Sequence, residues 1–194
     1  MEELIQAGKL VGVIDLSVHE IIDHLFHGIA GASGRLEAIT RTAIPAVVSV
    51  GGNDYLLFES VEKAPEAYKN RPVMVHNPQM TVFGPTQAEM EAAAQYMVDC
   101  LNRALGPTLV VIPAGGFTDV NQPGRELWFP EGNQAAIQVF KKGLRPEVPL
   151  IVVEAHINQP LFADVVSGCM SALLAGEAPA SIAARYQASA EAPA

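Results

Sequence analysis

The residues best suited to chemistry stand at the end of an apolar run, in the stretch LIVVEAHINQP. Glu154 and His156 are two positions apart there, so in an extended strand their side chains share a face. A carboxylate beside an imidazole orients the ring and raises its pKa, which suits acid/base catalysis or ligand binding. The alternative is a structural role, in which Glu154 accepts hydrogen bonds from backbone N–H groups. Asn158 is a candidate for ligand binding and equally a candidate helix cap.

Two glycine pairs, each followed by an aspartate, give further candidates. They occur in the stretches VGGND and PAGGFTD. Glycine lets backbone N–H groups approach an anion or a carbonyl oxygen closely, although a glycine pair after a strand is also an ordinary tight turn. Two such turns at one edge of a sheet favour ligand binding. The candidate ligand-binding residues in them are Gly51, Gly52, Asp54, Gly115 and Gly116.

Other polar residues follow or interrupt the remaining apolar runs. Asp15 follows the first run, Ser49 lies near the end of the second, and His76 and Asn77 follow the third. His76 joins His156 and Glu154 as a candidate catalytic residue, in a supporting role, whereas Asp15, Ser49 and Asn77 are candidates for ligand binding. The metal-protease motif H-E-x-x-H is not formed by the stretch HEIIDH, because its second histidine comes one position too late.

Five short runs rich in valine and isoleucine must position these residues. They cover residues 10–14, 44–50, 72–76, 108–113 and 149–155. Runs that are apolar on both faces are typical of parallel strands covered by helices on each side. We therefore predict an α/β fold with an open, doubly wound, mostly parallel sheet of about five strands, Rossmann-like or flavodoxin-like. The carboxyl ends of such strands meet at one edge, where ligands bind.

Helix-start signals separate the runs. Ser17 with Glu20, and Thr86 with Glu89, have the spacing of a capping box. Asn133 is expected to cap a helix that ends near residue 143, and Asn158 or Gln159 to cap one that ends near residue 175. Residues 1–175 are thus predicted to form a single α/β domain, and residues 176–194, rich in alanine and proline, a flexible tail.

Composition limits the partners. The formal net charge is −9, with 12 basic residues scattered along the chain, which disfavours nucleic acid and anionic membrane surfaces as partners. Several carboxylates at one edge suit a divalent cation, a polyol or an amine, while a nucleotide would need Mg²⁺ or groups from a partner chain. The two cysteines lie in helical patterns without metal-site spacing, which indicates core thiols in the cytoplasm.

The stretches GVIDLS, RLEAITRTAIPAVVSVGGND, HNPQMT, LNRALGPTLVVIPAGG and EAHINQPLFAD together resemble a known family. They are similar to the C-terminal half of the uncharacterised proteins grouped with the tomato mosaic virus resistance protein, often called an ATP-binding family. The resemblance implies two α/β domains, the first of which carries the nucleotide-binding annotation. Any ATP and Mg²⁺ would then be bound through the N-terminal half, and the cofactor of this chain itself is unknown. The chain is expected to be an excised domain or the product of a split gene.

Three functions are compatible with these features. The first is a ligand-binding C-terminal domain of a cytoplasmic protein, in which the polar edge forms a crevice with a nucleotide-binding N-terminal domain, fused or separate. It takes a small-molecule ligand, and a homo-oligomer is expected. The second is a complete enzyme, metal-assisted or acid/base, acting on a small polar metabolite. The third is a non-catalytic oligomerisation module.

Overall fold

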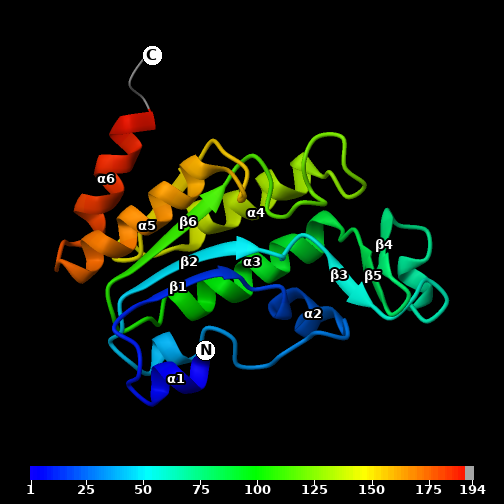
Figure 1. Cartoon of the computed structure of the whole chain (residues 1–194), viewed down its shortest axis with the longest axis horizontal. Coiled ribbons are helices and arrows are strands. Elements are labelled where there is room, and N and C mark those ends of the chain that lie inside the picture. The colour runs from blue at the N-terminus through cyan, green and yellow to red at the C-terminus, as the bar shows by residue number, and fades with distance from the viewer. Residues whose placement is uncertain (191–194) are drawn as a thin grey trace.

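The computed structural model describes residues 1–190 and has a four-stranded parallel sheet at its centre (Figure 1). The strand order across this sheet is β1-β2-β6-β7, which is also the order along the chain. The open, mostly parallel α/β sheet predicted from the sequence is therefore confirmed. The loops that follow the four strands line one edge. The strands are β1 (Val13–Ser17), β2 (Ala46–Gly51), β6 (Thr108–Pro113) and β7 (Leu150–Val153).

Alternating side chains of the sheet enter two separate cores. Val48 and Val110 belong to the core shared with the helices that connect the strands, whereas Val47 and Val111 face the helices that follow β7. Figure 1 shows α2 and α3 on one side of the sheet and α5 and α6 on the other. Both faces are thus covered, which accounts for strands that are apolar throughout. The main helices are α2 (Glu20–Phe26), α3 (Gln87–Leu101), α4 (Pro130–Gly143), α5 (Pro160–Leu174) and α6 (Pro179–Ala190).

A small antiparallel sheet lies beyond the carboxyl end of β2 (Figure 1). Its order is β3-β5-β4, so the apolar run at residues 72–76, expected as a strand of the parallel sheet, belongs here instead. Only two residues separate β4 from β5, which suffices for a hairpin but not for a parallel crossover. The strands are β3 (Leu56–Phe58), β4 (Val73–Asn77) and β5 (Met80–Phe83), and the other short elements are α1 (Glu2–Gln6), η1 (Ala38–Thr40) and η2 (Glu66–Tyr68).

Two of the predicted helix starts are confirmed. Thr86 and Glu89 form the capping box of α3, in which each side chain accepts a hydrogen bond from the backbone N–H of the other residue. Gln159 is the N-cap residue of α5, with Pro160 in the first turn. This decides between the two caps proposed for α5, and Asn158 lies just before the helix.

The other two predicted starts differ from the structure. α2 begins after His19 without a side-chain cap, because the carboxylate of Glu20 accepts a hydrogen bond from Arg35 instead of the backbone at Ser17. α4 begins at Pro130 with Phe129 as its N-cap residue, so the cap lies four residues earlier than predicted. Asn133 therefore lies within the helix, where its side chain bonds to Asn121.

The C-terminal segment also differs from the predicted flexible tail. Residues 179–190 form α6, which buries Ile182 and Ala183 against the core on the α5 side of the sheet. The amide of Gln187 donates a hydrogen bond to the carbonyl of Leu150 on β7. Residues 191–194 of the predicted tail lie outside the described residues. Within residues 1–190, no helix has the length and apolar character needed to cross a membrane.

Candidate functional site

Two hollows lie side by side at the carboxyl ends of the parallel strands. The first, which we call the strand-end hollow, has a volume of about 320 Å³. The second, the side hollow, has a volume of about 380 Å³ and lies against the small sheet. Thr118 and Asp119 line both hollows and form the wall between them. Other residues of the strand-end hollow are Ser17, Gly51, Gly52 and Asn158.

The loop that carries this wall is held by buried polar contacts. The Thr118 hydroxyl donates to Oδ2 of Asp54 over 2.9 Å, and the Thr118 carbonyl lies 2.9 Å from Nε2 of His156. Further along, the side chains of Asn121 and Asn133 bond to each other in both directions. The segment after β6 is therefore fixed to α4 and to the segments that follow β2 and β7, and it presents Thr118 and Asp119 in a defined position.

Asp54 is the most deeply buried carboxyl group of this region. Only 1% of the residue is exposed, and its Oδ1 has no hydrogen-bond partner among the described residues. Burial, which outweighs the hydrogen bond from Thr118, raises the pKa of Asp54 to about 7. A carboxyl group with a pKa near neutrality has the property required of a general acid or base. Asp54 lies behind Thr118, however, and is not among the residues that line either hollow.

His156 is held by hydrogen bonds at both ring nitrogens. Nδ1 accepts from the backbone N–H of Asn158, which assigns the proton to Nε2 and makes that nitrogen the donor to Thr118. The ring is buried and lies close to Gly116, where an added Cβ would be 2.7 Å from a ring carbon. His156 thus connects β7 to the Thr118 loop in its neutral form, a role that the sequence pattern alone does not distinguish from catalysis.

Glu154 does not form the predicted pair with His156. Its side chain is exposed, and no hydrogen bond joins the two among residues 1–190. Instead, Glu154 borders an apolar groove of about 440 Å³ beside β7, together with Leu161 and Tyr186. The strand ends at Val153, so the alternation that would put both side chains on one face does not extend to His156.

The third candidate catalytic residue and its neighbour lie on the small sheet. His76 is exposed and lines the side hollow. The side-chain oxygen of Asn77 accepts a hydrogen bond from the backbone N–H of Gln79 in the β4-β5 turn. The structure therefore brings His76 near Thr118 and Asp119, and it places Asn77 in a turn.

The glycines of both turns are required by close packing. A Cβ on Gly51 would lie 2.5 Å from the carbonyl oxygen of Leu16, and one on Gly52 would lie 2.5 Å from Cβ of His19. A Cβ on Gly115 would be 2.8 Å from the backbone nitrogen of His156. Only glycine fits these positions. At these positions the backbone passes so close to neighbouring segments that a side chain would not fit. Gly51 and Gly52 also line the strand-end hollow, so a side chain there would reduce the space for a ligand.

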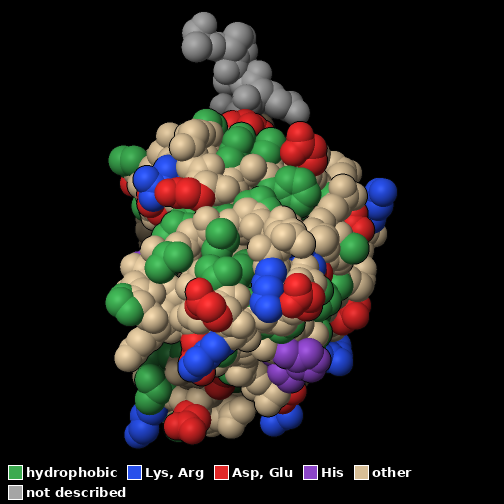
Figure 2. All heavy atoms as spheres, turned by 90° about the vertical axis from the view of Figure 1, so that its right-hand side faces the viewer, with side chains coloured by type: hydrophobic (Ala, Val, Ile, Leu, Met, Phe, Trp, Pro, Cys, Tyr) green, Lys and Arg blue, Asp and Glu red, His purple; other side chains and the backbone are tan. Residues whose placement is uncertain are grey.

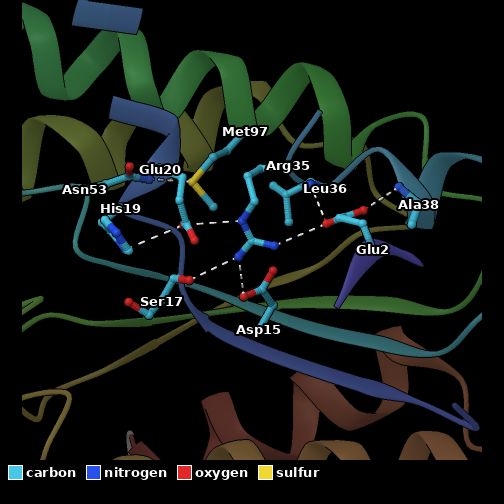
Figure 3. Close-up of polar contacts among 10 residues, drawn as sticks. All are labelled: Glu2, Asp15, Ser17, His19, Glu20, Arg35, Leu36, Ala38, Asn53 and Met97. Atoms are coloured by element: carbon cyan, nitrogen blue, oxygen red, sulfur yellow. Dashed lines mark hydrogen bonds and ion pairs between the residues drawn. The ribbon is translucent and has the colours of Figure 1, made fainter. Parts of the chain in front are cut away.

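Asp15 belongs to an ion-pair network around Arg35, a residue that the sequence reasoning missed (Figure 3). Arg35 donates to Asp15 over 2.9 Å, to Glu2 over 3.2 Å and to Glu20 over 3.3 Å. Glu2 also accepts from the backbone N–H groups of Leu36 and Ala38. Burial raises the pKa of Asp15 to about 6 despite the opposing effect of Arg35. The available signal was the lone arginine that follows the glycine-rich stretch GIAGASG.

Ser49 lies wholly inside the sheet. It is 0% exposed, and its hydroxyl has no partner among the described residues. It therefore does not reach either hollow. Residues 1–190 also contain no group of three or more histidine, cysteine, aspartate or glutamate side chains arranged to hold a metal ion.

Comparison with known proteins identifies the family. A family model described as "Uncharacterised protein family (UPF0261) C-terminal domain" matches residues 1–174. The chain belongs to the UPF0261 C-terminal domain family. The match includes both hollows, the Thr118 loop and the Arg35 network, whereas α6 follows the matched range.

Relatives of this UPF0261 domain are longer proteins. It is 32% identical over 172 residues to a UPF0261 protein of Rhizobium meliloti, a match that covers 84% of this chain and 42% of the relative. A UPF0261 protein of Clostridium tetani is 30% identical over 165 residues, covering 84% of this chain and 41% of the relative. The ToMV resistance protein Tm-1 of Solanum lycopersicum is 28% identical over 169 residues, a match that covers 86% of this chain and 22% of the tomato protein. The chain thus spans about two fifths of the bacterial relatives and about a fifth of the tomato protein.

Proposed function

We propose that this chain is the ligand-binding C-terminal domain of a two-domain cytoplasmic protein. In this proposal a small polar ligand occupies the strand-end hollow, and a nucleotide-binding N-terminal domain closes over it. The observation that carries the proposal is the pair of hollows that meet at Thr118 and Asp119, at the strand ends where ligands of open parallel sheets bind.

The rigidity of the wall supports a binding role. Thr118 is fixed through its hydroxyl by Asp54 and through its carbonyl by His156. Fixed polar groups lose little conformational entropy when a ligand binds, which favours affinity. The polar groups that a ligand can contact in the hollow are the Ser17 hydroxyl, the Asn158 amide and the Asp119 carboxylate, of which Asp119 also accepts hydrogen bonds from Gln122 and Arg125.

The shallowness of the strand-end hollow supports a second domain. A volume of about 320 Å³ is at the lower end for a small-molecule pocket. Ligand sites commonly form at domain interfaces, where a second surface removes the ligand from water. The bacterial relatives have more than half of their length outside the matched region, and that length is sufficient for such a domain.

An acid/base enzyme is less well supported. It would require Glu154 to orient His156, whereas in the described chain His156 is bonded to Thr118 and Asn158. Its two ring nitrogens are both engaged, so neither is free to exchange a proton with a ligand without breaking a contact that holds the loop.

Thermal unfolding with a panel of ligands tests the proposed function. The panel contains polyols, phosphorylated and carboxylated metabolites, Mg²⁺, Zn²⁺ and ATP, each measured with and without the N-terminal part of the Rhizobium meliloti relative. A ligand at 100 times its dissociation constant adds about 2.7 kcal/mol to stability. Ser17→Leu fills the hollow from an exposed position and is expected to abolish the stabilisation, while Ser167→Leu on α5 leaves it unchanged. Stabilisation that survives Ser17→Leu, or none from any member of the panel with both parts present, would contradict the proposal.

A further inference from the structure

We propose that the side hollow binds the aromatic ring of an amine ligand whose polar remainder lies in the strand-end hollow. This inference deepens the proposed function and rests on it. It concerns the end of the molecule shown in Figure 2, where hydrophobic side chains lie among acidic and basic ones and histidine is exposed.

The walls of the side hollow match a flat ring in shape and polarity. His19 and Tyr55 lie almost parallel, with ring centroids 6.4 Å apart and an angle of 23° between the planes. Met74 and Met80 add thioethers, and Leu57 and Val82 supply aliphatic surface. Aromatic rings and methionine sulfur both pack favourably against a further aromatic ring. A hollow of about 380 Å³ is large enough for one substituted ring.

The charges around the hollow favour a cation. Burial, and to a smaller extent the carboxylates of Asp54, Asp23 and Glu20, raises the pKa of Tyr55 to about 12. These nearby carboxylates attract an ammonium group, and a cation near the face of Tyr55 gains further stabilisation. Arg125, the nearby cation of the loop, is paired with Asp119 and Glu126. An anionic ligand would be repelled here.

The shared wall connects the ring site to the polar site. Thr118 and Asp119 line both hollows, so a single ligand can lie across them with its ring on one side and its polar groups on the other. On this arrangement Asp119, whose side chain is 65% exposed, receives the amine in exchange for its exposed pair with Arg125. Such a ligand uses the two small hollows together.

A matched series of small molecules measures the contribution of the aromatic ring to binding separately from that of the positive charge. Tyramine, para-ethylphenol and para-hydroxyphenylacetate carry similar rings with positive, neutral and negative substituents, and cyclohexylethylamine keeps the amine without an aromatic ring. Dissociation constants are measured by calorimetry and by the fluorescence of Trp128, the only tryptophan, which lies in the same loop. Tyramine is expected to bind at least about tenfold more tightly than either the carboxylate or the cyclohexyl compound. Equal affinity across the series, or no binding of tyramine, would overturn the inference.

Two variants at exposed positions of the small sheet locate the binding. Met80 and Val75 are exposed by 37% and 61% on the small sheet, and of the two only Met80 lines the hollow. Met80→Lys is expected to weaken tyramine binding about tenfold or more, and Val75→Lys to leave it unchanged. An equal effect of both, or of neither, would overturn the inference.

The Ser17→Leu variant distinguishes this inference from the proposed function. If a polar ligand stabilises the parent through Ser17 while tyramine does not bind, the ring site is wrong and the strand-end site stands. If Ser17→Leu changes neither ligand binding nor stability and tyramine also fails, both are wrong. Tyramine binding that depends on Met80 supports the ring site.

Discussion

Asp15 and Asp54 are buried aspartates at the carboxyl ends of neighbouring strands, and they are stabilised in different ways. Each accepts one side-chain hydrogen bond of 2.9 Å, Asp15 from the guanidinium of Arg35 and Asp54 from the hydroxyl of Thr118. Arg35 offsets part of the cost of burial at Asp15, whose pKa is raised to about 6, whereas Asp54 is more deeply buried and has no cationic partner, so that burial raises its pKa to about 7. Two hydrogen bonds of the same length therefore accompany different pKa values, because the charge of the donor and the depth of burial differ.

The two regions consequently serve different purposes. The Arg35 network joins α1, β1, α2 and the segment before η1, and it meets the hollows only through the Ser17 carbonyl and through His19, which pairs with Glu20 (Figure 3). Asp54 holds the loop that separates the hollows. We expect substitutions in the first region to change global stability, and substitutions in the second to change the pH dependence of stability and the shape of the site.

Replacing Arg35 is expected to have the largest effect. Arg35→Met leaves the carboxylates of Asp15, Glu2 and Glu20 without their shared cation, and breaking a buried ion pair costs about 3–5 kcal/mol of unfolding free energy. The loss is expected to be greatest at pH 8 and smaller near pH 4, because Asp15 is protonated at the lower pH. Urea unfolding at the two pH values measures it.

Arg41→Met is the control for this prediction. Arg41 forms an exposed pair with Glu37, and its side chain is 63% exposed. Such a pair contributes less than about 1 kcal/mol. If Arg35→Met and Arg41→Met lost the same unfolding free energy, the Arg35 network would contribute no more to stability than an exposed ion pair.

Asp54→Asn tests the second region through pH. The folded pKa of about 7 lies above the unfolded value, so the folded state holds the proton more tightly. Stability is thus expected to fall as the pH rises from about 4 to 7 and to level off above that, with a slope of up to about 1.4 kcal/mol per pH unit. The asparagine variant loses this contribution but keeps that of Asp15, whose pKa is also raised, so its curve is less steep and it gains stability relative to the parent as the pH rises. Asp99→Asn, at an exposed position on α3, should keep the slope, and a parent curve that is flat over this range would contradict the assignment.

Thr118→Val removes the hydroxyl that donates to Asp54 without a large change in volume. Removing a donor from a buried carboxylate costs about 1–3 kcal/mol, and the cost should be greater at pH 8 than at pH 5, where Asp54 is protonated. Thr42→Val is the comparison, since its hydroxyl donates only to the backbone carbonyl of Ala38. A pH-independent loss at Thr118 would indicate that the hydroxyl does not act on the charge of Asp54.

Glu20→Gln is expected to have the smallest effect. The side chain of Glu20 is 26% exposed. When Glu20 is neutralised, Arg35 keeps its contacts with the carboxylates of Glu2 and Asp15. Chemical denaturation should show a loss below about 1 kcal/mol. A loss as large as that of Arg35→Met would mean that Glu20, and not Asp15, is the main partner of the arginine.

The sequence predicted the elements better than their contacts. Apolar periodicity located the four parallel strands and most of the helices, because strand burial and helix capping are local properties. It misplaced residues 72–76, since a short β-rich run has the same composition in a parallel and in an antiparallel sheet. The order of the strands depends on packing across the whole chain, and the sequence left it open.

The candidate site shows the same limit at the level of single residues. Gly51, Gly52, Asn158 and His76 do line the hollows, whereas Gly115 and Gly116 do not. Glu154 and Ser49 do not, because the strand ends before His156 and because Ser49 points into the sheet. Arg35 was missed, and the contact between Thr118 and Asp54 was not predicted, since the partners are 20 and 64 residues away in the chain. Long-range hydrogen bonds of this kind leave no periodic signal.

The position of α6 has a consequence for how the protein behaves in concentrated solution. β7 is the last strand of its sheet, and an uncovered edge strand is a template for aggregation. α6 packs against this strand, and Gln187 occupies the outward carbonyl of Leu150. The segment that follows the family match therefore protects the molecule against edge-to-edge association, so a chain shortened to the matched residues would lose this protection together with a helix.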